Sequence, residues 1–158
     1  YFKSFEFNGS LYNVLREIGF QIYGYNQIEN IGKIGQIMVL VSAFLILIKS
    51  RRNRDLKSIF KYIVWLLLIY YAFASIVHPW YIIYLLTLSI FTNLRFPLVW
   101  SFVVVLSYYA YRDVGVVNES YWLIGFEYAV LLGAVVWDLL NLRKQSSLRI
   151  RESNEAVS

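Results

Sequence analysis

Long apolar segments alternate with short polar segments along most of this chain. The apolar segments lie at about residues 31–48, 59–77, 81–92, 96–111 and 121–140. A membrane core about 30 Å thick is crossed by a helix of roughly 17 to 25 apolar residues. The pattern predicts an all-α fold, a polytopic bundle of about five transmembrane helices.

The ends of the predicted spans carry residues typical of the membrane surface. Pro79 ends the second span at the residue before it, because a proline disfavours helical backbone at the preceding position. Trp80 and Tyr81 suit the headgroup layer. The third segment, residues 81–92, is short for a full crossing. It is tilted, thinly immersed or re-entrant, and the pattern leaves these alternatives open.

Basic residues are unevenly distributed over the two sides that five crossings would create. Eleven of them lie on the same side of the membrane as the dense cluster KSRRNRDLK, residues 49–57, or in that cluster itself. The other four lie on the opposite side. Short loops rich in Lys and Arg stay in the cytoplasm. This places the N-terminus of the chain outside and its C-terminal tail in the cytoplasm. If residues 81–92 did not cross, either the tail or the basic cluster would be outside.

The two flanking regions differ from the spans. Residues 1–30 form an outer interfacial segment, in which an apolar stripe at helical spacing predicts an amphipathic helix that starts near Ser10. The stripe consists of Leu11, Val14, Leu15, Ile18 and Ile22. Residues 141–158 form a basic cytoplasmic tail, which is expected to be disordered because it is largely polar.

The composition supports a membrane protein. Hydrophobic residues make up 59% of the chain and aromatic residues 19%, and the net charge is +5. Since the basic residues lie next to the predicted spans, attraction to anionic lipid explains them more simply than nucleic acid does. We therefore expect membrane lipids as partners, and no nucleic acid. The chain has no Cys, which excludes disulfides. It starts at Tyr1, and we expect it to be a piece of a longer protein.

Glu127 lies in the fifth predicted span, inside an apolar run. A carboxylate at the membrane centre costs roughly 2.5 to 3.5 kcal/mol, so we expect Glu127 to face protein or water, and it is the intramembrane polar candidate of this chain. The alternative is a structural role, in which it accepts hydrogen bonds from water or a tyrosine hydroxyl. Gly125, Ala129 and Gly133 form a stripe of small residues on this span, which favours close helix packing.

His78 is the only histidine, so no metal site with several histidines can form. A histidine at a helix end is more often an interfacial hydrogen-bonding group than a catalyst. Its neighbours Trp80 and Tyr81 place it at the outer surface, where a lipid phosphate would lie. Arg16 and Arg112 are predicted on the same side, and a guanidinium suits phosphate through paired hydrogen bonds. For each arginine, contact with solvent or lipid headgroups is the simpler interpretation.

Motifs of several enzyme classes are missing from the chain. It has no Gly-rich phosphate loop, no nucleophile elbow and no HExxH sequence. The acidic residues on the predicted outer side include no Asp-Asp or Asp-x-Asp pair that would bind a divalent cation or act as paired acid and base. We therefore identify no catalytic residue and no metal ligand within this chain.

Three stretches together resemble a known family. The chain contains FEFNGSLYNVLREIGFQIYGYNQI, followed by VHPWYIIYLLTLSIFTNLRFPLVWSFVVVLSYYAY and then ESYWLIGFEYAVLLGAVVWDL. This pattern resembles the C-terminal half of multi-span mannosyltransferase-like membrane proteins of Bacteroidetes, which belong with the GT-C type glycosyltransferases that use polyprenyl-phosphate sugars. The similarity covers about residues 2–140, and FNGSLYNVLR and HPWY are its most specific parts.

The resemblance implies a location in the bacterial inner membrane and a role for several outer residues. In such proteins the catalytic acidic residue lies near the N-terminus, in a part that this sequence lacks. A divalent cation would be possible in the full-length protein, and no other cofactor is evident. The residues implied as the wall that binds lipid phosphate and substrate are Asn8, Tyr12, Arg16, His78, Trp80 and Tyr81.

We therefore expect the C-terminal portion of an integral membrane glycosyltransferase. It would move a sugar, for instance mannose, from a polyprenyl-phosphate donor to an acceptor on the outer face, and the fragment alone would be inactive. Two other classes stay open. One is a non-enzymatic scaffold or assembly subunit that binds other membrane subunits. The other is an ion-coupled transporter fragment that uses Glu127.

Overall fold

The computed structural model describes residues 6–25, 27–51, 55–112 and 118–155, without the side chains of residues 28 and 149–153. In these residues the regular structure is helical, apart from one isolated parallel bridge between Phe7 and Ile76. The α-helices are α1 (Leu11–Tyr23), α2 (Ile28–Ser50), α3 (Leu56–Phe73), α4 (Ile82–Ser89), α5 (Phe96–Val103) and α6 (Tyr121–Glu155), and the 3-10 helices are η1 (Pro79–Tyr81) and η2 (Val104–Tyr111). The predicted all-α fold is confirmed.

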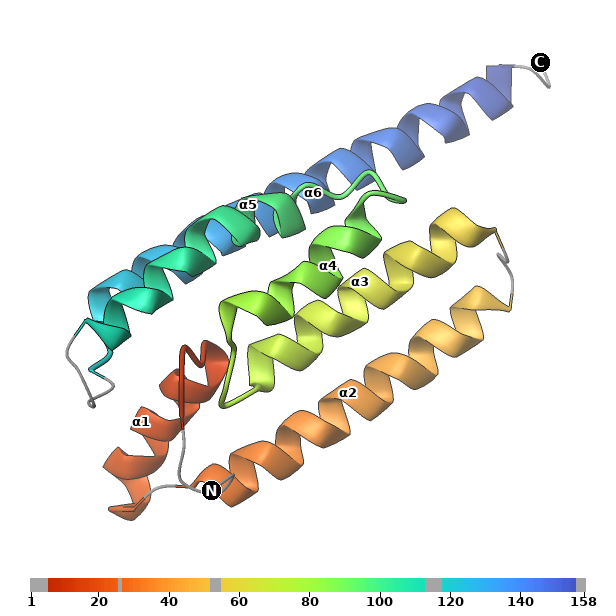
Figure 1. The fold of residues 1–158 in the computed structure, drawn as a ribbon. Coiled ribbons are helices and arrows are strands. Elements are labelled where there is room, and N and C mark those ends of the chain that lie inside the picture. Colours follow the sequence, from red (N-terminus) through yellow and green to blue (C-terminus); the bar gives the residue numbers. More distant parts are fainter. Residues whose placement is uncertain (1–5, 26, 52–54, 113–117, 156–158) are drawn as a thin grey trace.

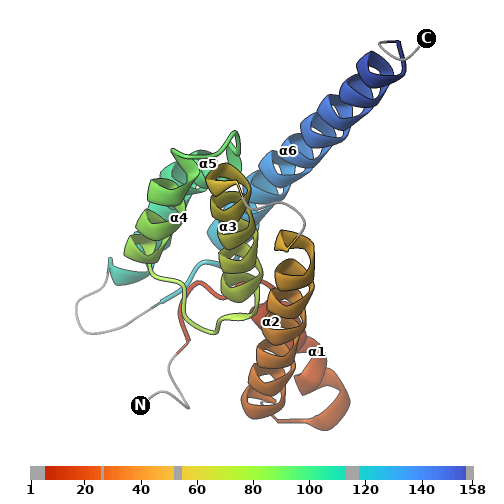
Figure 2. The same cartoon turned by 90° about the vertical axis from the view of Figure 1, so that its right-hand side faces the viewer.

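The longer helical elements form an antiparallel bundle, and the short helix α1 lies at one end of it (Figure 1). Helices that are neighbours in sequence are also neighbours in space, since α3 packs against α2 and α4, and α5 packs against α4 and α6. Along the bundle the direction alternates between α2, α3, the continuous unit of η1 and α4, the continuous unit of α5 and η2, and α6 (Figure 1). The C-terminal end of α2, the N-terminal end of α3 and the connection from α4 to α5 therefore lie toward the same end as the C-terminal end of α6 (Figure 1, Figure 2).

Three helices are long and apolar enough to span a membrane, namely Glu29–Ser50, Leu56–Phe73 and Tyr121–Leu148. Pro79–Ser89 and Phe96–Tyr111 are shorter apolar helices. Only 11% of the apolar window of α2, and of α3, is buried inside the molecule. Most of this apolar surface is therefore left to contact lipid or further protein. The molecule is a membrane-associated helical protein.

The second predicted span ends earlier than the sequence indicates. Helix α3 stops at Phe73, and the next residues are not helical because they pair with Phe7. The Phe7 N–H donates to the Ser75 carbonyl (2.9 Å), and the Val77 N–H donates to the Phe7 carbonyl (2.8 Å). Residues 74–77 thus belong to a backbone pairing that hydropathy alone does not reveal.

The third predicted span is the shortest. Together η1 and α4 cover residues 79–89. Such a segment is roughly 18 Å long, which is less than the thickness of the membrane core. Its direction nevertheless carries the chain from the α1 end of the bundle toward the opposite end (Figure 1). A full crossing by this segment stays a prediction.

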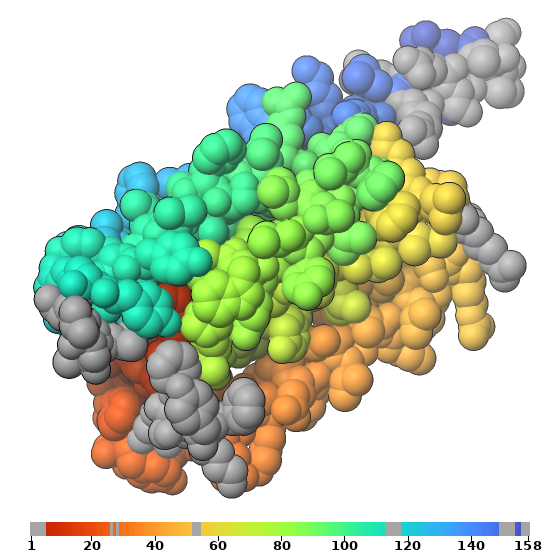
Figure 3. All heavy atoms as spheres, in the orientation of Figure 1, coloured from red at the N-terminus to blue at the C-terminus, as the bar shows by residue number. Residues whose placement is uncertain are grey.

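The last helix continues well beyond the predicted end of the fifth span. Helix α6 reaches Glu155, so the predicted disorder of the tail, residues 141–158, is wrong for residues 141–155. This segment contains Leu, Arg, Lys, Gln and Glu, which are good helix formers, and neither Gly nor Pro interrupts it. As a result α6 projects beyond the rest of the bundle (Figure 1, Figure 3).

The amphipathic helix predicted in the N-terminal segment is present as α1. Ser10 precedes it, as expected, but the Ser10 hydroxyl donates to the Ala72 carbonyl (3.1 Å) and does not cap the helix. Gly24 ends α1 in the left-handed backbone region (φ 74°), where glycine carries no steric cost. The contact of Ser10 fixes the start of α1 against the end of α3.

The core lies between α3, α4, α5 and α6. Its buried hydrophobic residues are Val64, Tyr71, Val77, Ile82, Leu85, Leu94, Phe96, Trp100, Val104 and Leu131. Asp138 on α6 is also buried, and its carboxylate accepts the N–H groups of Arg95 (2.7 Å) and Phe96 (2.9 Å). The N–H of Phe96 belongs to the first turn of α5. The N–H groups of a first turn have no partner within their own helix. Asp138 therefore fixes the start of α5 against α6.

Candidate functional site

Asn8 anchors residues 6–10 to helix α6. It is 1% exposed and has a left-handed backbone (φ 50°). Its N–H donates to the Glu119 carboxylate (2.5 Å), and its carbonyl accepts the Tyr128 hydroxyl (2.7 Å). Its side-chain amide donates to both carboxylate oxygens of Glu127 (3.1 and 3.2 Å). Asn8 is therefore a buried connector between distant parts of the chain.

Glu127 faces the interior of the protein. Its side chain is fully buried, and it accepts hydrogen bonds from the Asn8 amide and from the Trp100 indole N–H (2.9 Å). It therefore points toward protein, one of the two environments expected from the sequence, and it acts as a structural acceptor for an amide and an indole. The small residues of α6 behave differently, since no described atom lies within 4 Å of a Cβ built at Gly125 or Gly133. No described helix makes the close packing expected for that stripe.

Arg16 lies in a cluster of polar side chains between α1 and the start of α6. Its guanidinium forms an ion pair with Glu6 and donates to the Tyr121 hydroxyl (3.2 Å). The Tyr12 hydroxyl donates to the same Glu6 carboxylate (2.6 Å). The Arg16 side chain keeps 16% exposure and the Glu6 side chain 14%. The guanidinium is thus paired, but it remains partly accessible.

His78 belongs to an aromatic cluster that includes Phe7 of the 6–10 segment. Its ring stacks against Trp80 (centroids 4.1 Å apart) and against Phe7 (4.9 Å), and it meets Tyr81 edge-on (5.4 Å). Burial lowers the pKa of His78, so the folded protein favours its neutral form. These contacts give His78 a packing role.

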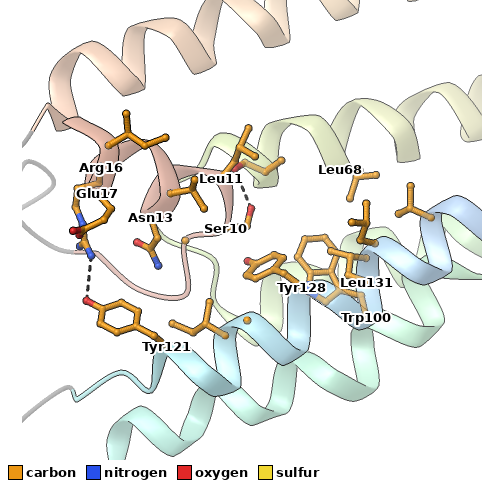
Figure 4. Close-up of a pocket in the computed structure, with 18 residues that line it drawn as sticks. Ser10, Leu11, Asn13, Arg16, Glu17, Leu68, Trp100, Tyr121, Tyr128 and Leu131 are labelled. Atoms are coloured by element: carbon orange, nitrogen blue, oxygen red, sulfur yellow. Dashed lines mark hydrogen bonds between the residues drawn. The ribbon is translucent and has the colours of Figure 1, made fainter. Parts of the chain in front are cut away.

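A large cavity of the described structure lies between α1, α3 and α6 (Figure 4). Its volume is about 870 Å³. Most of its lining is apolar, and the polar lining is concentrated on α1 and at the start of α6. The lining includes Leu11, Val14, Ile18, Leu68, Ala72, Trp100, Ile124, Leu131, Leu132 and Val135, together with Asn13, Arg16, Glu17 and Tyr121. Such a shape suits an amphiphile with a long apolar part and a polar head.

The structure separates the six residues that the family resemblance implies. Asn8, Tyr12 and Arg16 belong to the polar network around residues 6–10. The other three, His78, Trp80 and Tyr81, form the aromatic cluster. Only Arg16 among the six lines the large cavity, so a single phosphate pocket built from Arg16 and His78 is not what the described structure shows.

Several residues with a clear place in this site were not singled out by sequence reasoning. Glu6 neutralises Arg16, and Asn13 and Tyr121 line the cavity beside it. The sequence offers one weak signal, because a half-buried arginine needs a nearby carboxylate. Nothing in the spacing of Glu6, Arg16 and Tyr121 indicates that they meet.

Carboxylates are frequent in this region of the molecule. Burial raises the pKa of the Glu119 carboxyl, and the Asn8 N–H and the charge of Arg16 oppose this shift. Within the residues that the structure describes, no three His, Asp or Glu side chains are grouped so that they could hold a metal ion. The divalent cation implied for a full-length protein stays a prediction.

The comparisons with known proteins add no relative. No family model, no curated protein and no solved structure matches this chain. The resemblance to GT-C type mannosyltransferases therefore stays a prediction.

Proposed function

We propose that this chain is the C-terminal portion of an integral membrane glycosyltransferase of the GT-C type, and that the cavity between α1, α3 and α6 holds its polyprenyl-phosphate donor. The sugar would pass to an acceptor on the outer face of a bacterial inner membrane, the side on which α1 would lie. The apolar cavity with a guanidinium at one end is the observation that carries this proposal.

The dimensions and chemistry of the cavity support a lipid phosphate. Apolar side chains of α3 and α6 offer a surface against which an isoprenoid chain can pack through van der Waals contacts. Arg16 offers a planar donor pair that matches phosphate oxygens. An arginine aimed at the leaving phosphate would stabilise the charge that develops when the bond to the sugar breaks.

Glu6 has a defined role in this proposal. The Glu6 carboxylate forms an ion pair with the guanidinium of Arg16. A bound phosphate must therefore replace this carboxylate or share the guanidinium with it. The catalytic acidic residue is assigned to another part of the protein, as the family resemblance implies. Arg16 is thus the residue of this chain that we assign to the donor.

A scaffold without enzymatic activity is the second candidate. It is favoured by the internal pairing of Arg16 with Glu6 and Tyr121, and by the structural role of the Glu127 network. This function needs no ligand in the cavity. The two candidates therefore differ in whether the cavity binds a lipid phosphate.

The test measures equilibrium binding of labelled polyprenyl phosphate to the chain in lipid nanodiscs. Saturable binding is expected. Arg16→Ala should weaken it roughly tenfold to hundredfold, since hydrogen bonds to charged groups contribute about 1.5 to 3 kcal/mol. Arg16→Lys should restore only part of the affinity, because a point charge lacks the paired donors. Glu6→Gln should tighten binding, because it removes the competing carboxylate.

Lys33→Ala is the matched control. Lys33 lies near the α1 end of the bundle, is exposed and pairs with Glu29 on α2, and it is not part of the cavity lining. Removing its charge should leave binding nearly unchanged. Absence of saturable binding, or equal affinity in wild type and Arg16→Ala, would favour the scaffold.

A further inference from the structure

Asn13 is a polar residue of the cavity lining whose amide has no partner. Its Oδ1 and Nδ2 atoms are both buried, and neither forms a hydrogen bond in the described structure. An unpaired buried amide is destabilising, and native proteins satisfy most such groups. This position therefore suggests a ligand that supplies the missing bonds.

The location of Asn13 indicates which part of a ligand it would meet. It lies one turn before Arg16 on α1, and residues three apart share one face of a helix. Figure 4 shows Asn13 on the side of α1 that faces α6, with Tyr121 across from it. A group bound next to a phosphate at Arg16 would thus lie beside the Asn13 amide.

The amide needs both a donor and an acceptor. Nδ2 can donate to a phosphate oxygen, but an ionised phosphate has no hydrogen to offer Oδ1. A hydroxyl group both donates and accepts, so a sugar carries what a bare phosphate lacks. Rotation about the side-chain torsion next to the amide, which is broad in asparagine, would present either atom to the ligand.

We infer that Asn13 recognises a hydroxyl of the sugar next to the phosphate, so that the cavity prefers a glycosylated polyprenyl phosphate over the bare polyprenyl phosphate. This inference rests on the proposed function and names the form of the lipid that the site selects. The preference would favour entry of the loaded donor and release of the spent carrier after transfer.

The experiment compares two lipids on the same chain in nanodiscs, namely polyprenyl phosphate and its mannosyl ester. The wild type should bind the ester roughly fivefold to tenfold more tightly, as expected for one or two neutral hydrogen bonds. Asn13→Leu and Asn13→Ala should lose this preference and keep the affinity for the bare phosphate. Replacing an unpaired amide by Leu should not destabilise the fold. The smaller variant Asn13→Ala tests the same loss of the amide in case the Leu side chain fills part of the cavity. Asn141→Leu, outside the cavity lining, is the control.

The outcomes separate this inference from the proposed function. Equal affinity of the wild type for the two lipids, or a preference that persists in both Asn13 variants, overturns the inference. Binding of the bare phosphate that depends on Arg16 would still support the proposed function in that case. Failure of both lipids to bind overturns both proposals.

Discussion

Glu127 and Asn8 show how single residues hold this protein together across long stretches of sequence. The two are 119 positions apart, and their side chains meet in an otherwise apolar interior together with the indole of Trp100. Hydrogen bonds in such surroundings are strong when made and costly when one partner is lost. This network joins residues 6–10, α5 and α6 into one unit.

Replacing Glu127 tests this network. Glu127→Leu should destabilise the folded protein, because it leaves the Asn8 amide and the Trp100 N–H buried without an acceptor, at about 1 to 3 kcal/mol for each. Glu127→Gln keeps one oxygen acceptor and should cost clearly less. Thermal unfolding in detergent measures both. The exposed neighbour Phe126 provides the control Phe126→Leu, and equal, negligible effects of the two Glu127 variants would contradict the network.

Sequence reasoning reaches only part of this site. Glu127 stands out because a carboxylate inside an apolar run must find a polar partner. Its partner Asn8 cannot be found in this way, because the pairing depends on how the N-terminal segment folds back onto α6. The same holds for Glu6 and Arg16, whose ion pair follows from the path of the chain between them.

At the scale of the helical element, ends and junctions decide more than the apolar interiors do. Asp138 accepts two N–H groups at the start of α5, and Asp55 caps the start of α3 through the Ser58 N–H (2.9 Å). The first carboxylate is buried and the second is exposed. Water can replace a lost cap at the exposed position but not at the buried one.

Asp138→Ala is expected to destabilise the protein more than Asp55→Ala. The first change leaves the Phe96 N–H unpaired in the interior, at about 1 to 3 kcal/mol, and also removes the acceptor of the partly buried Arg95 N–H. The second removes an exposed cap, which costs about 0.5 to 2 kcal/mol. Asp138→Asn, which keeps an acceptor oxygen, should lie between wild type and Asp138→Ala. Denaturation in detergent provides the ranking, and the reverse order would contradict a buried cap.

The apolar pattern predicts where helices lie but not all of their ends. It finds α2, α3 and α6 because their length and hydropathy are sufficient in themselves. It misplaces the end of α3, where residues 74–77 pair with Phe7. It also underestimates α6, because a polar composition is compatible both with disorder and with an exposed helix.

At the scale of the whole molecule, the alternation of helix directions separates two chemically different ends. The C-terminal end of α2, the N-terminal end of α3, the connection from α4 to α5 and the C-terminal part of α6 lie toward one end, and α1 lies at the other (Figure 1). The charge pattern of the sequence predicted this separation. Which end faces the cytoplasm stays a prediction, because a bundle of helices has the same internal contacts in either orientation.

Single cysteines can determine the orientation, because the chain has no Cys of its own. Asn93, Asn118 and Ser146 are exposed positions outside the apolar interior. In intact cells an impermeant thiol reagent should label Asn118→Cys, and it should label Asn93→Cys and Ser146→Cys only after permeabilisation, since basic ends are retained in the cytoplasm. Labelling of Ser146→Cys in intact cells together with protection of Asn118→Cys would contradict the predicted topology. Arg51→Cys at the end of α2 then distinguishes the two causes, because it is labelled when the whole orientation is reversed and stays protected when only the segment of η1 and α4 fails to cross. Labelling of Asn93→Cys in intact cells, with Ser146→Cys still protected and Asn118→Cys labelled, would show that neither the segment of η1 and α4 nor the segment of α5 and η2 crosses the membrane.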